Sequence, residues 1–391
     1  MLQIFQGWRR ELDAGEIHAH RQHKTGSSVI GLPPESAEVL IRSAVNHKQL
    51  GCKRVTRNET NDQVLLAVRV FASVARPGTA DMSALVEATS RLPLLNLDRW
   101  ERLIRWELSY LAIEAVKKHP WRTFWNQGSP FLWLTWVDLC AGDGFRRERA
   151  LRVLFGAAPN RFFLAMAVRR LNDWVHQVRE AANERLLSIA NASAPEDVAD
   201  VLCAVLPHRN SWGRMDENSK QTLHAIISID AVVNILRSRI ISTASGPMAA
   251  ILAQAGQTPA LDKYLREIAN SAIQPSVRAK AYQCLLDGKI VWLAGRKRIW
   301  TDIRYCKSRL EPVFCNRPLT VASPFEETLQ SASSDRSPIV RRIAGSVLVR
   351  EWKQMGAFAF TLAEALSLDA DAAVAAKGKY VLKALQVSAD A

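Results

Sequence analysis

The sequence predicts an all-α protein built from repeated helix pairs, and three observations support this. Gly and Pro number only 18 and 16 in 391 residues, so turns do not dominate as they do in many-stranded β proteins. Apolar residues recur at helical spacing, whereas alternating β-branched runs are scarce. A short motif, Val-Arg-x-x-Ala, also recurs along the second half of the chain.

The motif recurs at spacings that indicate a repeat. An apolar Leu follows eight residues after the Val in every copy. The Val positions are 99, 63 and 34 residues apart, which is close to three, two and one units of about 33 residues. The copies are Val178–Ala182, Val277–Ala281, Val340–Ala344 and a degenerate Val374–Gly378.

The motif also predicts how each helix starts and packs. An Asp lies five residues before the Val in three copies, and Pro275 marks the same junction in the fourth; both residue types favour a helix start. Val, Ala and Leu at four-residue intervals form one buried stripe, and the small Ala lets a neighbouring helix approach. We expect the Arg to lie over apolar surface with its head in water. The three acids are Asp173, Asp335 and Asp369.

These residues resemble the second helix of the HEAT (armadillo-like) repeat. The resemblance covers about residues 170–390 and implies a right-handed α-solenoid of HEAT-like helix pairs, a fold that presents an extended binding surface. We expect an irregular helical region over 1–140 and HEAT-like repeats over 141–391, with insertions near 207–218 and 295–324. Helices expected before the legible repeats cover residues 37–48, 62–74, 97–118, 146–156 and 160–172.

Charge and composition narrow the class of protein. The net charge of +14 suggests an anionic partner, which could be nucleic acid, an acidic protein or an anionic membrane surface. The longest apolar run, Phe131–Cys140, is about half of a membrane span, and the N-terminus lacks the apolar core of a signal peptide. Six scattered Cys without a Cys-x-x-Cys pair favour reduced thiols. We therefore expect a cytoplasmic protein with no membrane span and no structural zinc.

Basic clusters are the main candidate contact sites. Seven basic residues and one acid, Asp302, lie between Lys289 and Arg309 with three aromatic residues, a composition typical of nucleic-acid binding. The alternative is a solvated basic helix whose aromatic side chains anchor it to the core. Two further clusters lie at residues 47–57 and 146–152. The candidate contact residues are Arg296, Lys297, Arg298, Trp300, Arg304, Lys307, Arg309, Lys53, Arg54, Arg57, Arg146 and Arg147.

One aromatic stretch suggests an enzyme. Asp138 is the only acid in a Trp-rich segment, and a class of alkylpurine DNA glycosylases built from HEAT-like repeats is similar in combining tryptophans with a catalytic Asp. The alternative is a Trp-filled core in which Asp138 caps or bonds a neighbouring helix. The aromatic residues are Trp121, Phe124, Trp125, Phe131, Trp133 and Trp136.

Three functions therefore remain open. The first is a non-catalytic scaffold or adaptor subunit that binds a protein partner within a larger assembly. The second is a subunit that binds DNA or RNA, and the third is the glycosylase with Asp138 as its catalytic residue. No nucleotide-binding, hydrolase or metalloprotease motif occurs, so we expect no cofactor and no metal.

Overall fold

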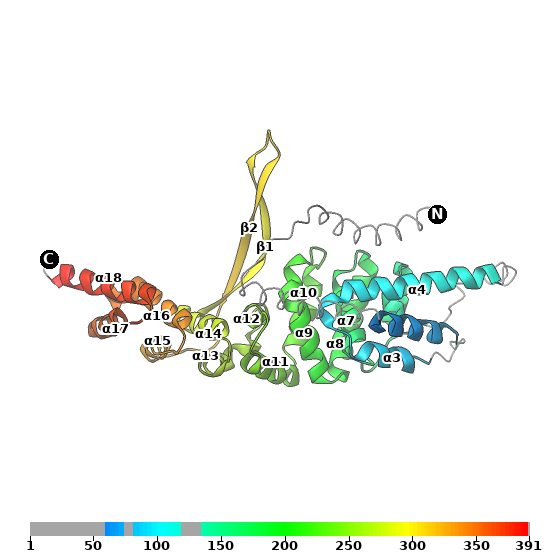
Figure 1. Cartoon of the computed structure of the whole chain (residues 1–391), viewed down its shortest axis with the longest axis horizontal. Coiled ribbons are helices and arrows are strands. Elements are labelled where there is room, and N and C mark those ends of the chain that lie inside the picture. Colours follow the sequence, from blue (N-terminus) through cyan, green and yellow to red (C-terminus); the bar gives the residue numbers. More distant parts are fainter. Residues whose placement is uncertain (1–58, 74–80, 119–133, 390–391) are drawn as a thin grey trace, which may run out of the picture. The chain divides into compact units, whose positions relative to one another are not determined.

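The structure is a computed structural model that describes residues 59–73, 81–118 and 134–389 (Figure 1). The chain divides into two compact units, Met1–Asn61 and Asp62–Ala391. Nearly all of the first unit, including the helix expected over 37–48, lies outside the described residues. Residues on both sides of position 140 belong to the second unit.

The described residues are mainly helical, as expected. A helix over residues 59–73 comes first, and α4 has the bounds that the apolar spacing predicts, Leu97–Lys118. The helices up to the middle of the chain are α3 (Ser83–Ser90), η2 (Leu94–Asn96), α4, η3 (Trp136–Cys140), α6 (Gly144–Val153), α7 (Arg161–Arg169), η4 (Arg170–Asn172), α8 (His176–Ala192), α9 (Pro195–Val205), η5 (Leu206–Ser211) and α10 (Glu217–Ile227).

The second half continues the helices but contains one sheet. The remaining elements are α11 (Asp230–Ser242), α12 (Met248–Ala255), η6 (Pro259–Tyr264), α13 (Leu265–Ser271), α14 (Pro275–Asp287), β1 (Lys289–Asp302), β2 (Lys307–Pro318), α15 (Phe325–Ser333), α16 (Pro338–Glu351), η7 (Trp352–Gln354), α17 (Ala357–Ser367) and α18 (Ala372–Ala389).

Helices two apart in the chain pack against each other. In one row α6 contacts α8, α8 contacts α10, α14 contacts α16 and α16 contacts α18. In a second row α7 contacts α9 and α9 contacts α11. Consecutive helices such as α13 and α14, or α17 and α18, close each pair, and the apolar side chains between the rows form one core.

The Val-Arg-x-x-Ala motif forms the buried stripe that its spacing predicts. Val277 and Ala281 in α14 are fully buried, as are Val340 and Ala344 in α16. In α18 the corresponding small residue is Gly378, and a Cβ there would lie 2.4 Å from a backbone nitrogen of α17. At Gly378, α17 and α18 therefore approach so closely that a Cβ would clash with the backbone.

The sequence predicts that the guanidinium group of the motif Arg lies in water, and the structure corrects this prediction. The guanidinium Nη1 of Arg179, Arg278 and Arg341 donates in each case to the carbonyl six residues earlier, at 2.9 Å. The Arg278 side chain is only 2% exposed, and Arg147 in α6 makes the same kind of contact. The Arg therefore ties its own helix to the segment that precedes it.

Three of these four arginines also make a bidentate pair with the Asp of the following helix pair. We call the three bidentate pairs Arg147–Asp173, Arg278–Asp335 and Arg341–Asp369 the Arg–Asp rungs, with N···O distances of 2.6–2.9 Å. Each Asp also accepts a hydrogen bond from the amide two residues later, just ahead of a helix start. The Asp thus connects successive pairs, as well as marking the start of a helix.

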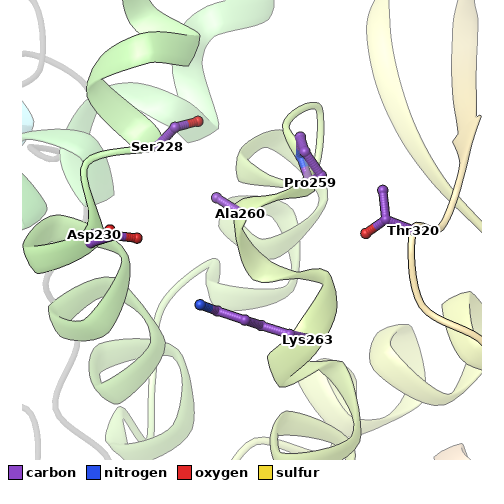
Figure 2. Close-up of a pocket in the computed structure, with 6 residues that line it drawn as sticks. All are labelled: Ser228, Asp230, Pro259, Ala260, Lys263 and Thr320. Carbon is purple, nitrogen blue, oxygen red and sulfur yellow. The ribbon is translucent and has the colours of Figure 1, made fainter.

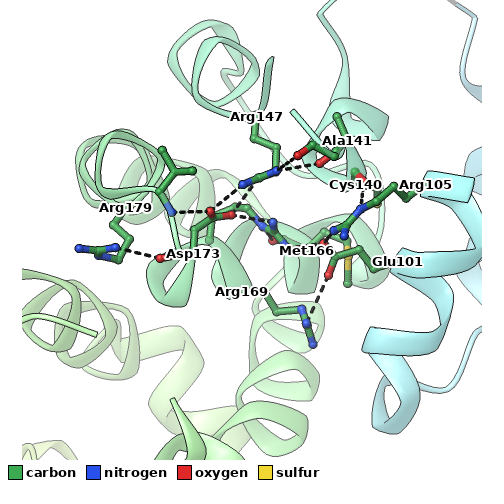
Figure 3. A network of polar contacts seen from close by, with 12 residues as sticks. Glu101, Arg105, Cys140, Ala141, Arg147, Met166, Arg169, Asp173 and Arg179 are labelled. Atoms are coloured by element: carbon green, nitrogen blue, oxygen red, sulfur yellow. Dashed lines mark hydrogen bonds and ion pairs between the residues drawn. The ribbon is translucent and has the colours of Figure 1, made fainter. Parts of the chain in front are cut away.

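The first rung belongs to a larger cluster of buried charges (Figure 3). Arg170 donates to both Glu101 of α4 and Asp173, each at 2.8 Å. Burial alone would raise the pKa of the Asp173 carboxyl, but hydrogen bonds from Arg147 and the charge of Arg170 hold it below its usual value. The cluster joins α4 to α6, η4 and the start of α8.

One long segment departs from the all-α expectation. Residues 289–318, predicted as part of a helical or loop insertion, form the antiparallel strands β1 and β2. The 63 residues between Val277 and Val340 are therefore not two helix pairs. They hold one pair, completed by α15 and α16, and this two-stranded insertion. The other expected insertion, near 207–218, is the short helix η5 followed by a loop before α10.

Candidate functional site: the β-hairpin arm

The strands β1 and β2 form one long hairpin, which we call the arm (Lys289–Pro318; Figure 1). Its register runs from Lys289 opposite Pro318 to Asp302 opposite Lys307, with irregularities after Leu293 and after Trp300. At the turn, a carboxylate oxygen of Asp302 accepts hydrogen bonds from the backbone amides of Arg304 and Tyr305. An isolated two-stranded hairpin is marginally stable in water, so its attachment to the helices matters.

The root of the arm is packed against α12 and α14. Ile290 is buried and packs directly on Gly256, where a Cβ would lie only 2.0 Å from its Cδ1. Gln254 donates to the carbonyl of Leu293 at 2.8 Å, and Lys280 donates to the carbonyl of Val291 at 2.7 Å. These side chains hold the first strand from two different helices.

An ion pair fixes the second strand. Arg317 makes a bidentate pair with Asp262 of η6, at 2.6 and 2.9 Å, and also donates to the carbonyls of Gly256 and Thr258. Burial alone would raise the pKa of the Asp262 carboxyl, but the hydrogen bonds from Arg317 and Thr320 keep it below its usual value. We call this contact the root lock.

Beyond the root, the arm exposes large apolar side chains. Trp300 is 50% exposed, and Tyr305 at the turn is 72% exposed. Large exposed apolar patches are typical of interaction sites, so this concentration on one element makes the arm a candidate. The other exposed apolar residues of the arm are Ile303, Leu310, Val313 and Phe314.

The arm also brings together most of the predicted contact residues. The Arg298 guanidinium lies 5.7 Å from the Trp300 ring centre, and the Lys307 ammonium lies 5.5 Å from that of Tyr305, both within cation–π range. Glu311 is paired with Arg309. The basic residues on the exposed arm are Lys289, Arg296, Lys297, Arg298, Arg304, Lys307 and Arg309.

The other two predicted basic clusters are not part of this surface. Lys53, Arg54 and Arg57 lie outside the described residues. Arg147 is 1% exposed and forms the first Arg–Asp rung, so the structure corrects its assignment as a contact residue. Arg146 bonds the buried carboxylate of Asp138 at 2.5 Å.

Asp138 occupies a structural position in η3. Its side chain is 1% exposed; one oxygen accepts from Arg146, and the other accepts from the amide of Thr135 at 2.7 Å. Burial raises the pKa of the Asp138 carboxyl, against the effects of Arg146 and Thr135. This environment matches the capping alternative, in which Asp138 bonds the start of its own short helix and a neighbouring helix. Of the accompanying aromatic residues, Trp136 is buried and the others lie outside the described residues.

A small hollow lies beside the root, between α11 and η6 (Figure 2). It has a volume of about 290 Å³ and is lined by Ser228, Asp230, Pro259, Ala260, Lys263 and Thr320. The Ser228 hydroxyl donates to the carbonyl of His224, and the Thr320 hydroxyl donates to Asp262, so neither hydroxyl is paired with Asp230 or Lys263.

Sequence reasoning missed the residues that hold the arm. Asp262 and Gln254 are distant in sequence from the strands that they contact, and neither belongs to a recognisable motif. Lys280 lies within the Val277–Ala281 motif, but that motif does not indicate a contact with a strand. Within the described residues, no group of His, Cys, Asp and Glu side chains is arranged to hold a metal ion. No helix in that part of the chain is long and apolar enough to span a bilayer. No protein-family model matches the chain, and no curated protein is significantly similar to it.

Proposed function

We propose that the chain is a non-catalytic scaffold or adaptor subunit that binds a protein partner within a larger assembly. We further propose that its helix pairs form a right-handed α-solenoid of the HEAT type. Three features support this fold: helices two apart pack in rows, the small residue of each motif admits a neighbour, and rungs connect successive pairs. Solenoids of this kind act through extended surfaces rather than through enclosed sites.

The observation that carries the proposed function is the contrast within the arm. Its root is buried and held by the root lock, Gln254 and Lys280, whereas the outer part exposes six large apolar side chains. Holding a surface in place before binding reduces the ordering cost of association. Aromatic and Arg side chains are also the types most enriched at the energetic centres of protein interfaces.

Removal of the arm tests this function. In one variant a short Gly-containing turn replaces residues 291–316, which leaves Ile290 and the root lock in place. The wild-type chain and this variant are each purified from native cells, and the proteins that accompany them are compared by quantitative mass spectrometry. We expect a stable protein partner in near-equal amount with the wild type and its loss from the variant. The same partner recovered in the same amount with both chains would refute the assignment of the arm.

A second candidate function is binding of nucleic acid. The observation that favours it is the charge of +6 over residues 289–309 together with Trp300 and Tyr305, which can stack on bases. Binding of a labelled DNA duplex or RNA should then weaken steeply with salt. Reversing the charges of Arg296, Lys297 and Arg298 should flatten that dependence by about 0.9 per lost phosphate contact. An unchanged salt dependence would exclude this segment as a nucleic-acid site.

A further inference from the structure

The two faces of the arm differ in chemistry. Side chains alternate between the faces of a strand, and residues directly opposite each other on paired strands share a face. The irregularity after Leu293 switches this alternation in β1, so Leu293 and Arg296 share a face. We call it the Arg-aromatic face: Leu293, Arg296, Arg298 and Trp300 of β1 lie opposite Phe314, Pro312, Leu310 and Ser308 of β2.

The acids of the arm are confined to the other face. Asp302 and Glu311 are the only two acids in residues 289–318, and both share a face with Lys297 and Arg309. There Glu311 is paired with Arg309 and lies directly across from Lys297. The opposite face therefore largely neutralises itself, while Arg296 and Arg298 share their face with no acid.

The exposed apolar area is also uneven. Trp300, Leu310 and Phe314, which are 50%, 56% and 61% exposed, all belong to the Arg-aromatic face. Among the strand residues of the opposite face, Val313 is the large apolar side chain with most exposure, at 41%. One face thus combines two uncompensated guanidinium groups with most of the exposed apolar surface of the strands.

We propose that the Arg-aromatic face is the docking site for a protein segment that carries carboxylates beside apolar side chains. This inference rests on the proposed function and specifies the partner's chemistry. A guanidinium binds a carboxylate through two parallel hydrogen bonds, which a lysine cannot make. Trp300, Leu310 and Phe314 supply the apolar contact, and the Arg298 guanidinium is already stacked near the Trp300 ring.

The balance of side chains favours protein over nucleic acid as the occupant. Interfaces with nucleic acid are more polar and much more positively charged than those between proteins. The Arg-aromatic face has two cations against three exposed large apolar side chains, two of them aromatic. That composition resembles the centre of a protein interface, where apolar contact is bordered by charge pairs.

A matched pair of variants tests the choice of face. Arg296→Gln with Arg298→Gln removes two positive charges from the Arg-aromatic face, and Lys297→Gln with Arg309→Gln removes two from the opposite face. Both variants remove the same amount of charge from the arm. Equal midpoint temperatures of thermal unfolding for the two variants and the wild-type chain would show that the fold is retained.

The probe is a displayed library of random peptides of about 16 residues, selected on the full-length wild-type chain. Individual peptides are then labelled, and their dissociation constants are measured by fluorescence anisotropy. We expect the selected peptides to combine Asp or Glu with Leu, Phe or Trp. The Arg296/Arg298 variant should weaken their binding by about tenfold or more, as should Trp300→Ala, whereas the Lys297/Arg309 variant should change it less than about threefold.

Several outcomes would overturn the inference. Equal losses in the two double variants would mean that net charge, and not one face, determines binding. If no peptide is selected, or if the selected peptides lack Asp and Glu, the proposed chemistry of the partner segment is wrong. If a labelled DNA duplex or RNA binds more tightly than any selected peptide, the ligand of this face is nucleic acid and not a protein segment. If any of these occurs while arm removal still loses the native partner, the face assignment fails and the proposed function stands.

Discussion

The rung between Arg278 and Asp335 gives the sharpest prediction about stability. The two side chains are 2% and 9% exposed, and their two hydrogen bonds are both 2.8 Å long. Breaking a buried ion pair by removing one partner costs about 3–5 kcal/mol, because the other charge is left buried without compensation. We therefore expect Asp335→Asn to lower the free energy of unfolding by about 3–5 kcal/mol.

A surface pair provides the control for this prediction. Arg266 and Glu327 are 3.0 Å apart, but their side chains are 47% and 65% exposed. Such pairs contribute about 0–1 kcal/mol, so Glu327→Gln should change stability by no more than that. The assay is urea unfolding followed by far-UV circular dichroism, with hydrogen exchange in α15–α18 to detect local unfolding. A loss for Asp335→Asn no larger than that for Glu327→Gln would refute the structural role of the rung.

The same carboxylate makes stability depend on pH. Burial opposes ionisation of Asp335, but the hydrogen bonds from Arg278 and from the Ser337 amide hold its pKa below the usual value. A carboxyl whose pKa is lowered by folding contributes its full stabilisation above its pKa in the unfolded chain, which is about 4. This stabilisation is lost as the pH falls through the lower pKa of the folded chain. Stability of the wild-type chain should therefore fall below about pH 4, and Asp335→Asn should lack this part of the loss.

Three further substitutions test the packing and the arm. Gly378→Ala would place a Cβ 2.4 Å from a backbone nitrogen of α17 and should cost about 1–3 kcal/mol in thermal unfolding, whereas Gly213→Ala, with open space around it, should be nearly neutral. Arg317→Ala removes the root lock and should speed hydrogen exchange of the β1 and β2 amides about tenfold or more, while helices away from the root keep their protection. Cys306 has a φ of 50°, so Cys306→Gly should stabilise the turn by about 1 kcal/mol, seen as slower exchange near the tip.

The helices could be predicted because their signals are local. The bounds of α4 follow from apolar residues at helical spacing, and in the first three copies of the motif the Val, Ala and Leu are buried where that spacing places them. The burial of the motif Arg could not be predicted from such local spacing. Arg is mostly a surface residue, and here it is buried because an Asp distant in sequence lies opposite it. The sequence shows that both the Arg and the Asp recur, but it does not show that they pair with each other.

The arm was missed because the usual hairpin signals are absent. Its turn, Ile303 to Cys306, contains no Gly or Asn, the residues that mark a tight hairpin. The outer strands are exposed on both faces, so apolar and polar residues do not alternate clearly along them. The remaining signal was composition: Ile290-Val291-Trp292 and Ile299-Trp300-Thr301 are β-branched and aromatic runs within a basic segment. The sequence predicts that the basic residues of this segment lie close together, which the structure shows. They lie on two strands, however, and not on a helix or a loop.

The spacing of the rungs explains how a helical repeat accommodates the arm. Two rungs join residues 26 and 28 positions apart, whereas Arg278 and Asp335 are 57 apart. The arm occupies 30 of those positions, residues 289–318, and the remaining 27 match the other rungs. The arm is therefore an insertion between α14 and α15 that leaves the contact between successive pairs intact. A chain without its outer arm should keep this rung and its helical fold, so a lost partner can be attributed to the arm itself.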